Sequence, residues 1–407
     1  MDDLGKPLPE GVKPLPLGGG NPARIEAVEK AYRAEMEKLL SSPDGFEDVI
    51  SHYDSPQGRM SFISAVTEFL NRKFGWNLEE GNIAITNGSQ SAMFYLFNLL
   101  SGRSGGRVRK ILFPVMPEYV GYADQGVEEG TFVGVPSIIE SISEHVFKYK
   151  VDFEAVERCL EDEDINAIAV SRPTNPTGNV LTDDEIERLS ELACRKDIPL
   201  IIDNAYGLPF PDIVFNDDCH ITWNENIILS MSLSKIGLPS IRTGIIIARK
   251  DIAEALSNMN AIAALASGSM GQVLAEDLVR TGRIEELARE EVRPFYKAKA
   301  DRAEALVNRY FEGTEYSYHR IEGSIFMWLC LPRLSMPSID FYSLIKKDGV
   351  VTVPGEYFFY GLGEDSKKHP HYSRCLRLNY SGPDDVVEEG IRIISQRYRE
   401  CYEGSGL

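Results

Sequence analysis

The stretch Ile227-Ile228-Leu229-Ser230-Met231-Ser232-Leu233-Ser234-Lys235 decides the interpretation of this chain, because it places a primary amine directly after an apolar run. Such a run, bounded by polar residues, predicts a buried β-strand. Burial disfavours the charged form of an amine, so we expect the pKa of Lys235 to lie below its usual range. The neutral amine is then a nucleophile toward aldehydes.

Hydroxyl and guanidinium groups flank Lys235 in the sequence. Ser232 and Ser234 precede it, and Arg242 follows it by seven positions. Such groups bind phosphate by donating hydrogen bonds to its oxygens. An amine that forms a Schiff base beside a phosphate pocket is typical of a site for pyridoxal 5'-phosphate (PLP).

Short apolar runs and helical periodicity alternate along the chain from about residue 60. The apolar runs predict strands at 110–113, 167–171, 200–203, 227–231 and 244–248. Amphipathic patterns predict helices at 26–40, 61–74, 91–100 and 183–195. This alternation predicts an α/β fold in which helices cover both faces of a mostly parallel sheet.

Polar motifs begin where three of these predicted strands end, at 171–176, 203–206 and 232–235. The carboxyl ends of parallel strands meet at one edge of the sheet, where such folds bind ligands. We therefore expect the side chains of these motifs to converge on one site.

The pattern changes near residue 286. A long charged helix is predicted over 283–310, followed by strand-like segments at 324–331, 349–353 and 375–380. We predict an N-terminal arm and helix at 1–48, with residues 1–18 extended, a large cofactor-binding domain at 49–285, and a smaller α/β domain at 286–407.

Composition excludes several classes of function. The chain has 407 residues, of which 43% are apolar, so it can form a sizeable core. Its net charge of −19 argues against nucleic acids and anionic membranes as partners. No apolar run approaches the roughly 18 residues of a membrane span. The N-terminus resembles no secretory signal, so we expect a cytoplasmic protein.

The six cysteines form no CxxC pair, so their spacing predicts neither a zinc site nor a disulfide framework. We expect free thiols and no metal. These cysteines are Cys159, Cys194, Cys219, Cys330, Cys375 and Cys401.

Two residues near one predicted strand end suit a pyridine ring. Asp203 either caps the next element or pairs with the ring nitrogen, which keeps the ring protonated and electron-withdrawing. Tyr206 lies three residues later and either packs in the core or reaches the ring's phenolic oxygen. Asn175, in an Asn-Pro-Thr-Gly turn, is a second candidate for that oxygen.

Anion binding has two further candidates. Gly88-Ser89-Gln90 precedes the predicted helix 91–100, and a helix N-terminus offers free N–H groups to a phosphate. A plain helix cap is the alternative. Arg377 lies between apolar residues and either faces solvent or captures a substrate carboxylate. Tyr119 is a candidate to stack on the ring, with core packing as the alternative.

The order of these motifs resembles that of the fold type I PLP-dependent aminotransferases of class I/II. The resemblance rests on Asn175-Pro176-Thr177-Gly178, Asp203-x-x-Tyr206 and Ser232-x-Ser234-Lys235 and covers nearly the whole chain. SRPTNPTGNV (171–180) and IDNAYG (202–207) are similar to the valine–pyruvate aminotransferase subgroup. The family implies a large domain with a mostly parallel seven-stranded sheet and a smaller α/β domain.

The resemblance also implies residue roles. Lys235 would bind PLP covalently and carry the proton, and Asp203 and Tyr119 would support catalysis at the ring. Cofactor contacts would come from Gly88, Ser89, Gln90, Tyr119, Asn175, Asp203, Tyr206, Ser232, Ser234, Lys235 and Arg242. Tyr53 would reach the phosphate of a partner subunit, which implies a homodimer. Gly20, Asn175 and Arg377 would bind the substrate.

Three positions bear on specificity. Arg242 is seven residues after Lys235, where many family members have eight, and Ser240 replaces a glycine that is usual in the subgroup. Arg172, beside the Asn175 turn, either binds a second carboxylate or forms a structural salt bridge.

The leading hypothesis is a transaminase that moves the amino group of a small aliphatic amino acid, such as valine or alanine, to or from a 2-oxo acid such as pyruvate. A different amino-acid specificity or a carbon–sulfur β-lyase on the same fold is the alternative. A non-catalytic PLP-binding regulator is a third reading, which the chain's acidity disfavours.

Overall fold

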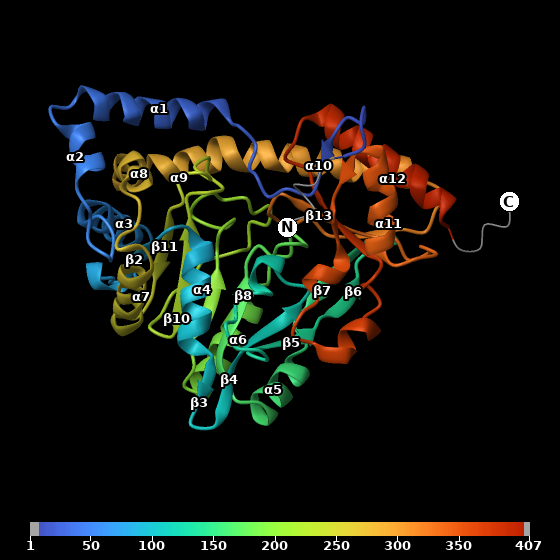
Figure 1. The fold of residues 1–407 in the computed structure, drawn as a ribbon, viewed down its shortest axis with the longest axis horizontal. Coiled ribbons are helices and arrows are strands. Elements are labelled where there is room, and N and C mark those ends of the chain that lie inside the picture. Colours follow the sequence, from blue (N-terminus) through green and yellow to red (C-terminus); the bar gives the residue numbers. More distant parts are fainter. Residues whose placement is uncertain (1–7, 403–407) are drawn as a thin grey trace.

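A large mixed sheet forms the centre of the protein (Figure 1). The computed structural model describes residues 8–402, without the side chains of residues 365 and 366. Within this part the sheet has eight strands in the order β2-β11-β10-β9-β8-β4-β3, with β5 also paired to β4. These strands are β2 (Ile83–Thr86), β3 (Gly102–Ser104), β4 (Arg107–Met116), β5 (Phe132–Pro136), β8 (Ile165–Ser171), β9 (Leu200–Asp203), β10 (Ile227–Ser232) and β11 (Gly244–Ile247).

The predicted mostly parallel arrangement is confirmed for the centre of the sheet. Strands β5, β4, β8, β9 and β10 pair in parallel, whereas β11 is antiparallel to both β10 and β2. One strand more than the expected seven is present, because the three-residue β3 forms a hairpin with the start of β4.

The register of the sheet brings the predicted motifs to one edge. Asp203, the last residue of β9, lies between Ser171 of β8 and Ser230 of β10. Gly244, the first residue of β11, lies between Ser232 and Thr86, the last residues of β10 and β2. The loops that follow β2, β8, β9 and β10 therefore leave the sheet at the same edge.

Eight helices accompany this sheet in the part of the chain that the structure describes. They are α1 (Glu26–Ser41), α2 (Gly45–Ser51), α3 (Met60–Phe74), α4 (Ser89–Leu100), α5 (Phe153–Asp162), α6 (Asp183–Arg195), α7 (Lys250–Ala264) and α8 (Ser269–Thr281). The sequence predicts four of them, α1, α3, α4 and α6. The start of α6 has a capping box, in which Thr182 and Glu185 satisfy each other's backbone N–H groups.

The predicted helix 283–310 is interrupted. It consists of α9 (Arg283–Leu287), a π-helical turn at Ala288–Val292 and α10 (Arg293–Phe311). Pro294 lies in the first turn of α10. Because proline has no backbone N–H, it cannot form the regular helical hydrogen bond to the preceding turn. The helical path therefore continues only through a wider turn.

A second, six-stranded sheet lies beside the first. Its order is β15-β16-β13-β12-β7-β6. The strands are β6 (Ile138–Ser141), β7 (Val146–Lys150), β12 (Ser317–His319), β13 (Phe326–Cys330), β15 (Val353–Pro354) and β16 (Cys375–Asn379), accompanied by α11 (Ser338–Ile345) and α12 (Asp384–Glu400). Strands β6 and β7 belong to this second sheet, although they fall inside the range 49–285 predicted for the large domain. The domain boundaries at 48 and 285 remain a prediction.

The N-terminal arm is tied to the C-terminal part of the chain. Its strand β1 (Leu15–Pro16) pairs in parallel with β14 (Val350–Val351). The backbone N–H of Asn379 donates to the carbonyl of Leu17. Residues 1–7 of the predicted extended arm lie outside the described residues. The described arm delivers the glycines at 18–20 to the edge where the strand-end loops meet.

No helix in the described part of the chain is long and apolar enough to cross a membrane.

Candidate active site

Lys235 lies in the turn that directly follows β10, as its position in the sequence predicts. Its Nζ donates a hydrogen bond of 2.5 Å to the carbonyl oxygen of Gly20 and lies 5.4 Å from the centre of the Tyr206 ring. Burial, reinforced by the positive charges of Arg377 and Arg242, lowers the pKa of Lys235 to about 8. A larger fraction of this amine is therefore neutral near pH 8 than of an ordinary lysine.

Asp203 is buried at the end of β9, and both its carboxylate oxygens accept hydrogen bonds. One accepts from the Tyr122 hydroxyl, and the other accepts from the backbone N–H of Ala205 at 3.1 Å. Burial raises the pKa of Asp203, whereas the bond from Tyr122 lowers it. These two hydrogen bonds hold the Asp203 carboxylate in one orientation. Both donors are neutral groups, so they do not balance its negative charge.

Tyr122 is a site residue that the sequence did not reveal. It sits in a short 3-10 turn (Val120–Tyr122), buried, with its ring edge-on to Tyr119 at 5.0 Å between centroids. The available signal was its position three residues after Tyr119, which places both rings on one side of a helical turn.

Substituting Tyr122 with phenylalanine should lower kcat about tenfold. The variant loses one hydrogen bond to a charged group, which contributes about 1.5 kcal/mol. Steady-state kinetics of the PLP-loaded enzyme measure the effect. Tyr32→Phe is the matched control, because that buried hydroxyl has no hydrogen-bond partner among residues 8–402. An equal loss in both variants would contradict a role for the bond to Asp203.

Glu118 is a second residue that the sequence analysis missed. It is buried and accepts hydrogen bonds from the Ser171 N–H at 2.9 Å, the Ser171 hydroxyl at 2.5 Å and the Tyr119 N–H at 2.6 Å. Burial raises the pKa of Glu118 to about 7, although these bonds oppose the shift. Glu118 joins the end of β8 to the backbone of Tyr119 and so positions the Tyr119 ring.

An anion cradle is formed by the start of α4 and by Arg242. Gly88 is the N-cap of α4 with φ +84°, and a Cβ there would lie 2.2 Å from Arg242 Nη2. Glycine is therefore required both by conformation and by the close approach of the guanidinium. The first N–H groups of α4 and the Arg242 guanidinium thus lie side by side, an arrangement that suits a phosphate.

The serines of the cradle contribute in different ways. Arg242 Nη1 donates to the Ser234 hydroxyl at 3.2 Å and to the Pro239 carbonyl at 3.1 Å. The Ser232 hydroxyl accepts from the Ser234 N–H at 3.1 Å. The Ser89 hydroxyl donates to the Met231 carbonyl at 3.1 Å, so its backbone N–H is the group left for an anion. The Gln90 side chain likewise donates to the Gly121 carbonyl at 2.8 Å.

The short spacing between Lys235 and Arg242 is accommodated by the backbone. Arg242 adopts φ +56°, a left-handed conformation that is uncommon for a residue with a side chain. This turn lets its guanidinium reach Gly88 with seven residues of separation. Ser240 is exposed in the same loop.

Arg377 lies buried on β16 between two aromatic rings. Its guanidinium carbon is 4.1 Å from the centre of the Phe326 ring and 5.3 Å from that of Phe358. Nη1 donates to Asn175 Oδ1 at 2.8 Å and Nη2 donates to the Gly18 carbonyl at 2.6 Å, whereas Nε is buried and has no partner in the described part of the chain. Burial lowers the pKa of Arg377 to about 10, so it remains charged at neutral pH.

A family model described as aminotransferase class I and II matches residues 17–394. The chain belongs to the class I and II aminotransferases. It is 43% identical over 390 residues to the valine–pyruvate aminotransferase of Escherichia coli K12. The aligned region covers 96% of this chain and 92% of that protein.

Solved structures of aminotransferases share this fold. The crystal structure of valine–pyruvate aminotransferase AvtA from Salmonella typhimurium LT2 has a TM-score of 0.87 at 42% identity and covers 95% of each chain. The kynurenine aminotransferase of Pyrococcus horikoshii, solved with PMP, has a TM-score of 0.78 at 21% identity and covers 96% of this chain and 92% of that one. The predicted fold type is confirmed.

Class I and II aminotransferases depend on PLP, and the residues of this chain fit it. The cradle at Gly88 suits the phosphate, the buried Asp203 carboxylate suits a protonated ring nitrogen, and the Lys235 amine suits the aldehyde. When bound, PLP withdraws electrons from the α-carbon of an amino acid. The buried Arg377 Nε, without a protein partner, fits a substrate carboxylate.

In this aminotransferase the guanidinium of Arg172 is bound by residues that the sequence did not assign to the site. Its three nitrogens donate to the Leu181 carbonyl at 2.7 Å, the His220 carbonyl at 2.8 Å and Asp183 Oδ1 at 2.6 Å. Of the two interpretations of Arg172, the structure supports the structural salt bridge. Tyr53, predicted to serve a partner subunit, is 83% exposed.

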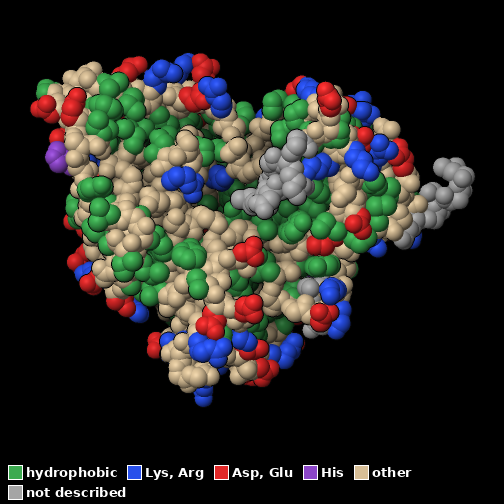
Figure 2. Space-filling view, viewed as in Figure 1, with side chains coloured by type: hydrophobic (Ala, Val, Ile, Leu, Met, Phe, Trp, Pro, Cys, Tyr) green, Lys and Arg blue, Asp and Glu red, His purple; other side chains and the backbone are tan. Residues whose placement is uncertain are grey.

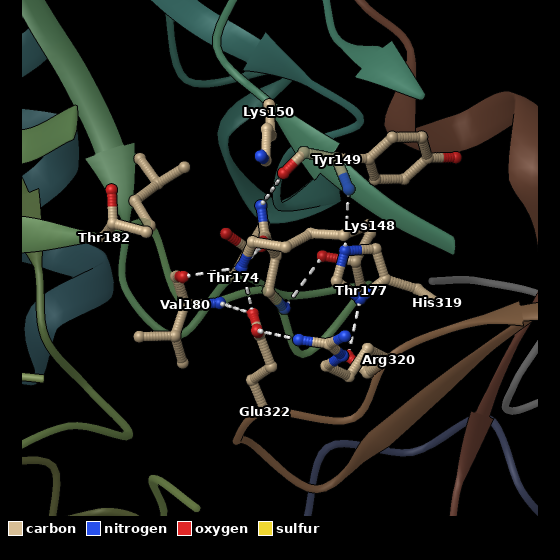
Figure 3. Close-up of polar contacts among 12 residues, drawn as sticks. Lys148, Tyr149, Lys150, Thr174, Thr177, Val180, Thr182, His319, Arg320 and Glu322 are labelled. Carbon is tan, nitrogen blue, oxygen red and sulfur yellow. Dashed lines mark hydrogen bonds and ion pairs between the residues drawn. The ribbon is translucent and has the colours of Figure 1, made fainter. Parts of the chain in front are cut away.

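The Asn175 turn of the aminotransferase is anchored to the second sheet by a buried ion pair (Figure 3). Lys148 of β7 pairs with Glu322 and donates to Asn179 Oδ1 at 3.0 Å and to the Val180 carbonyl at 2.9 Å. Glu322 also accepts from the Val180 N–H at 3.0 Å. Gly178 closes the turn with φ +72°, and a Cβ there would lie 2.7 Å from the Gly323 carbonyl.

Replacing Lys148 with methionine should destabilise the protein by about 3–5 kcal/mol. The substitution removes the buried counter-charge of Glu322 and leaves, among the described residues, only Arg320, 3.9 Å away and 45% exposed. The midpoint of urea denaturation measures the loss. Lys150→Met on the same strand is the matched control, because its pair with Glu140 is about 40% exposed and should contribute at most about 1 kcal/mol. Equal shifts in both variants would contradict this account of the anchor.

Proposed function

We propose that this aminotransferase transfers the amino group of a small aliphatic amino acid, of the valine or alanine type, to or from a 2-oxo acid such as pyruvate. The charges around Lys235 carry the proposal. The charged residues that shift the pKa of the Lys235 amine are Arg377, Arg242 and Asp203. With Arg242 at the phosphate and Asp203 at the ring, Arg377 is the one cation of this set that is left, and it suits one carboxylate.

The identity and fold comparisons support the same substrate class. The relatives from E. coli and S. typhimurium that match most of this chain are named valine–pyruvate aminotransferases. The salt bridge of Arg172 to Asp183 removes the one other arginine near the Asn175 turn that the sequence had suggested for a side-chain carboxylate.

We assign the residues the following roles. Lys235 would hold the cofactor covalently, and its Nζ would take up the α-proton of the amino acid and give it back. Asp203 keeps the pyridine ring protonated, Tyr119 stacks on the ring, and Asn175 and Tyr206 contact its phenolic oxygen. The phosphate contacts come from Gly88, Ser89, Gln90, Ser232, Ser234 and Arg242. Arg377, the Gly20 backbone and Asn175 hold the substrate carboxylate.

A comparison of kcat/KM values for valine, alanine, aspartate and glutamate tests the substrate class, with 2-oxobutyrate as a common acceptor. Valine and alanine should exceed the two dicarboxylates by at least about tenfold, since an unpaired buried carboxylate costs about 1–3 kcal/mol. A preference for aspartate or glutamate would overturn the proposal, and release of ammonia without an acceptor would favour the lyase.

We also infer a homodimer in which Tyr53 completes the phosphate site of the partner. Tyr53, Ile262 and Leu265 are 83%, 89% and 55% exposed. Ile262 lies in the last turn of α7 and Leu265 directly follows this helix, which contacts the segment after Tyr53 because Asn260 donates to the Pro56 carbonyl at 2.9 Å. Figure 2 shows hydrophobic side chains gathered on the side of the molecule that carries α3 and α7 in Figure 1.

Sedimentation and PLP titration test the dimer together. A dimer should form at micromolar concentration, and Tyr53→Phe should weaken PLP binding without changing its mass. A monomer that binds PLP equally well with either residue would contradict the shared site.

The six cysteines form no disulfide in the structure, which supports a reducing, cytoplasmic location.

A further inference from the structure

Two cysteines and a histidine that are far apart in the sequence meet in the second sheet. Cys330, the last residue of β13, lies directly opposite Cys375, the first residue of β16. His371 lies four residues before Cys375. One potential ligand atom from each residue lies within 4.8 Å of the other two. The spacing of the cysteines had predicted no metal, because strand pairing, and not a CxxC motif, brings them together.

The chemistry of these donors suits a soft metal ion. Two thiolates and an imidazole are ligands that zinc prefers. At Zn–S and Zn–N distances of about 2.3 and 2.0 Å, the ligands of a tetrahedral zinc lie about 3.3–3.8 Å apart. The ligand atoms of this cluster all lie within 4.8 Å of one another, so shifts of about 1 Å would bring them to zinc-binding separations. Two thiolates would also neutralise a divalent ion, so the buried site would carry no net charge.

The histidine is held by a second layer of hydrogen bonds, as in established metal sites. His371 Nδ1 lies 2.6 Å from the Tyr149 hydroxyl, which also accepts from Trp328 Nε1 at 3.1 Å. Both Tyr149 and Trp328 are buried. Figure 3 shows the Tyr149 phenol directed away from the Lys148–Glu322 pair. With Nδ1 engaged by Tyr149, Nε2 of His371 would be the nitrogen that binds a metal.

The path to solvent and the rigidity of the strands complete the geometry. His371 is only half-buried, whereas both cysteines are buried. Ligands from an antiparallel strand pair keep a fixed separation, because the paired backbones hold their register. Arg377 follows Cys375 by two residues and therefore points to the same face of the sheet.

We propose that Cys330, Cys375 and His371 bind one Zn²⁺ ion per chain, with water in the fourth position. The ion clamps β13 to β16 beside Arg377 and stabilises the second sheet. None of the three ligands is a residue assigned to PLP or substrate, so the proposal does not depend on the substrate assigned above.

Metal titration of the PLP-loaded enzyme tests the site, after reduction of its thiols and removal of metal with a chelator. One equivalent of Zn²⁺ should bind and raise the thermal midpoint. Co²⁺ should give the visible bands of a tetrahedral thiolate site at wavelengths beyond the absorption of PLP. His371→Ala and Cys375→Ser should abolish both signals, and Cys194→Ser, which changes an exposed thiol, should retain them.

Tyr149→Phe removes the hydrogen bond to His371 but leaves all three ligands, so zinc affinity should fall about 10- to 100-fold. If the buried Cys375 variant does not fold, His371→Ala decides the matter, because this side chain is half-buried. Zinc binding that persists in His371→Ala would identify an adventitious ion and overturn the proposal. Formation of a Cys330–Cys375 disulfide in an enzyme that takes up no zinc would also overturn it.

Discussion

Lys235→Ala should lower the rate of transamination by about four orders of magnitude, the upper end of what a positioned acid–base group contributes. The variant lacks the amine to which we assign the transfer of the α-proton. Its PLP should still bind through the phosphate cradle, but without the absorbance of the lysine-linked cofactor. Rapid mixing with an amino acid, followed by absorbance, measures the loss.

Lys250→Ala is the control for Lys235, because Lys250 pairs with Glu79 on the surface and is 54% exposed. Its activity should equal that of the unchanged enzyme. Retention of more than about a tenth of the activity by Lys235→Ala would contradict the acid–base role, since such a role accounts for at least about a hundredfold.

Arg377→Gln should lower kcat/KM for valine roughly 100-fold, or about 3 kcal/mol. The guanidinium is buried and charged, and it would bind the substrate carboxylate through two charge-assisted hydrogen bonds. Arg377→Lys should not restore the rate, because a lysine cannot contact Asn175, Gly18 and the substrate together. Steady-state kinetics with valine measure both variants.

Two comparisons separate carboxylate binding from a general disturbance of the site. The unchanged enzyme should strongly prefer valine to 2-methylpropylamine, which lacks the carboxylate, and Arg377→Gln should lose this preference. Arg172→Gln, which changes a buried arginine outside the site, should lower stability but keep the preference. Preserved selectivity in Arg377→Gln would contradict the assignment.

The sequence predicted that the strand-end motifs meet at one sheet edge, because strand ends are local features. Asp203 and Lys235 each follow an apolar run, and parallel pairing then brings the two loops to one edge. The Lys235 pKa also behaves as expected, because its cause, burial at a strand end, is visible in the sequence.

The residues that were missed depend on long-range packing. Tyr122 reaches Asp203 across 81 positions, and Glu118 reaches Ser171 across 53. Neither partner can be identified from a local pattern, since tyrosines and glutamates are common in turns. The same reason explains why Cys330 and Cys375, which pair across two strands, suggested no cluster.

The sequence also did not predict that β6 and β7 belong to the second sheet. Their residues follow the large sheet in the chain, and only the pairing of Tyr318 and His319 with Val146 and Phe147 assigns them elsewhere. The spacing of Arg242 is a different case. The seven residues were visible, but the left-handed φ of +56° that makes them sufficient was not.

The most direct test of the account is a single half-reaction of the PLP-loaded enzyme with L-valine and no oxo acid. The account predicts that bound PLP converts to the pyridoxamine form, that one equivalent of 3-methyl-2-oxobutanoate appears per site, and that added pyruvate restores PLP and yields alanine. An unchanged cofactor spectrum with valine, or release of ammonia in place of the pyridoxamine form, would contradict it.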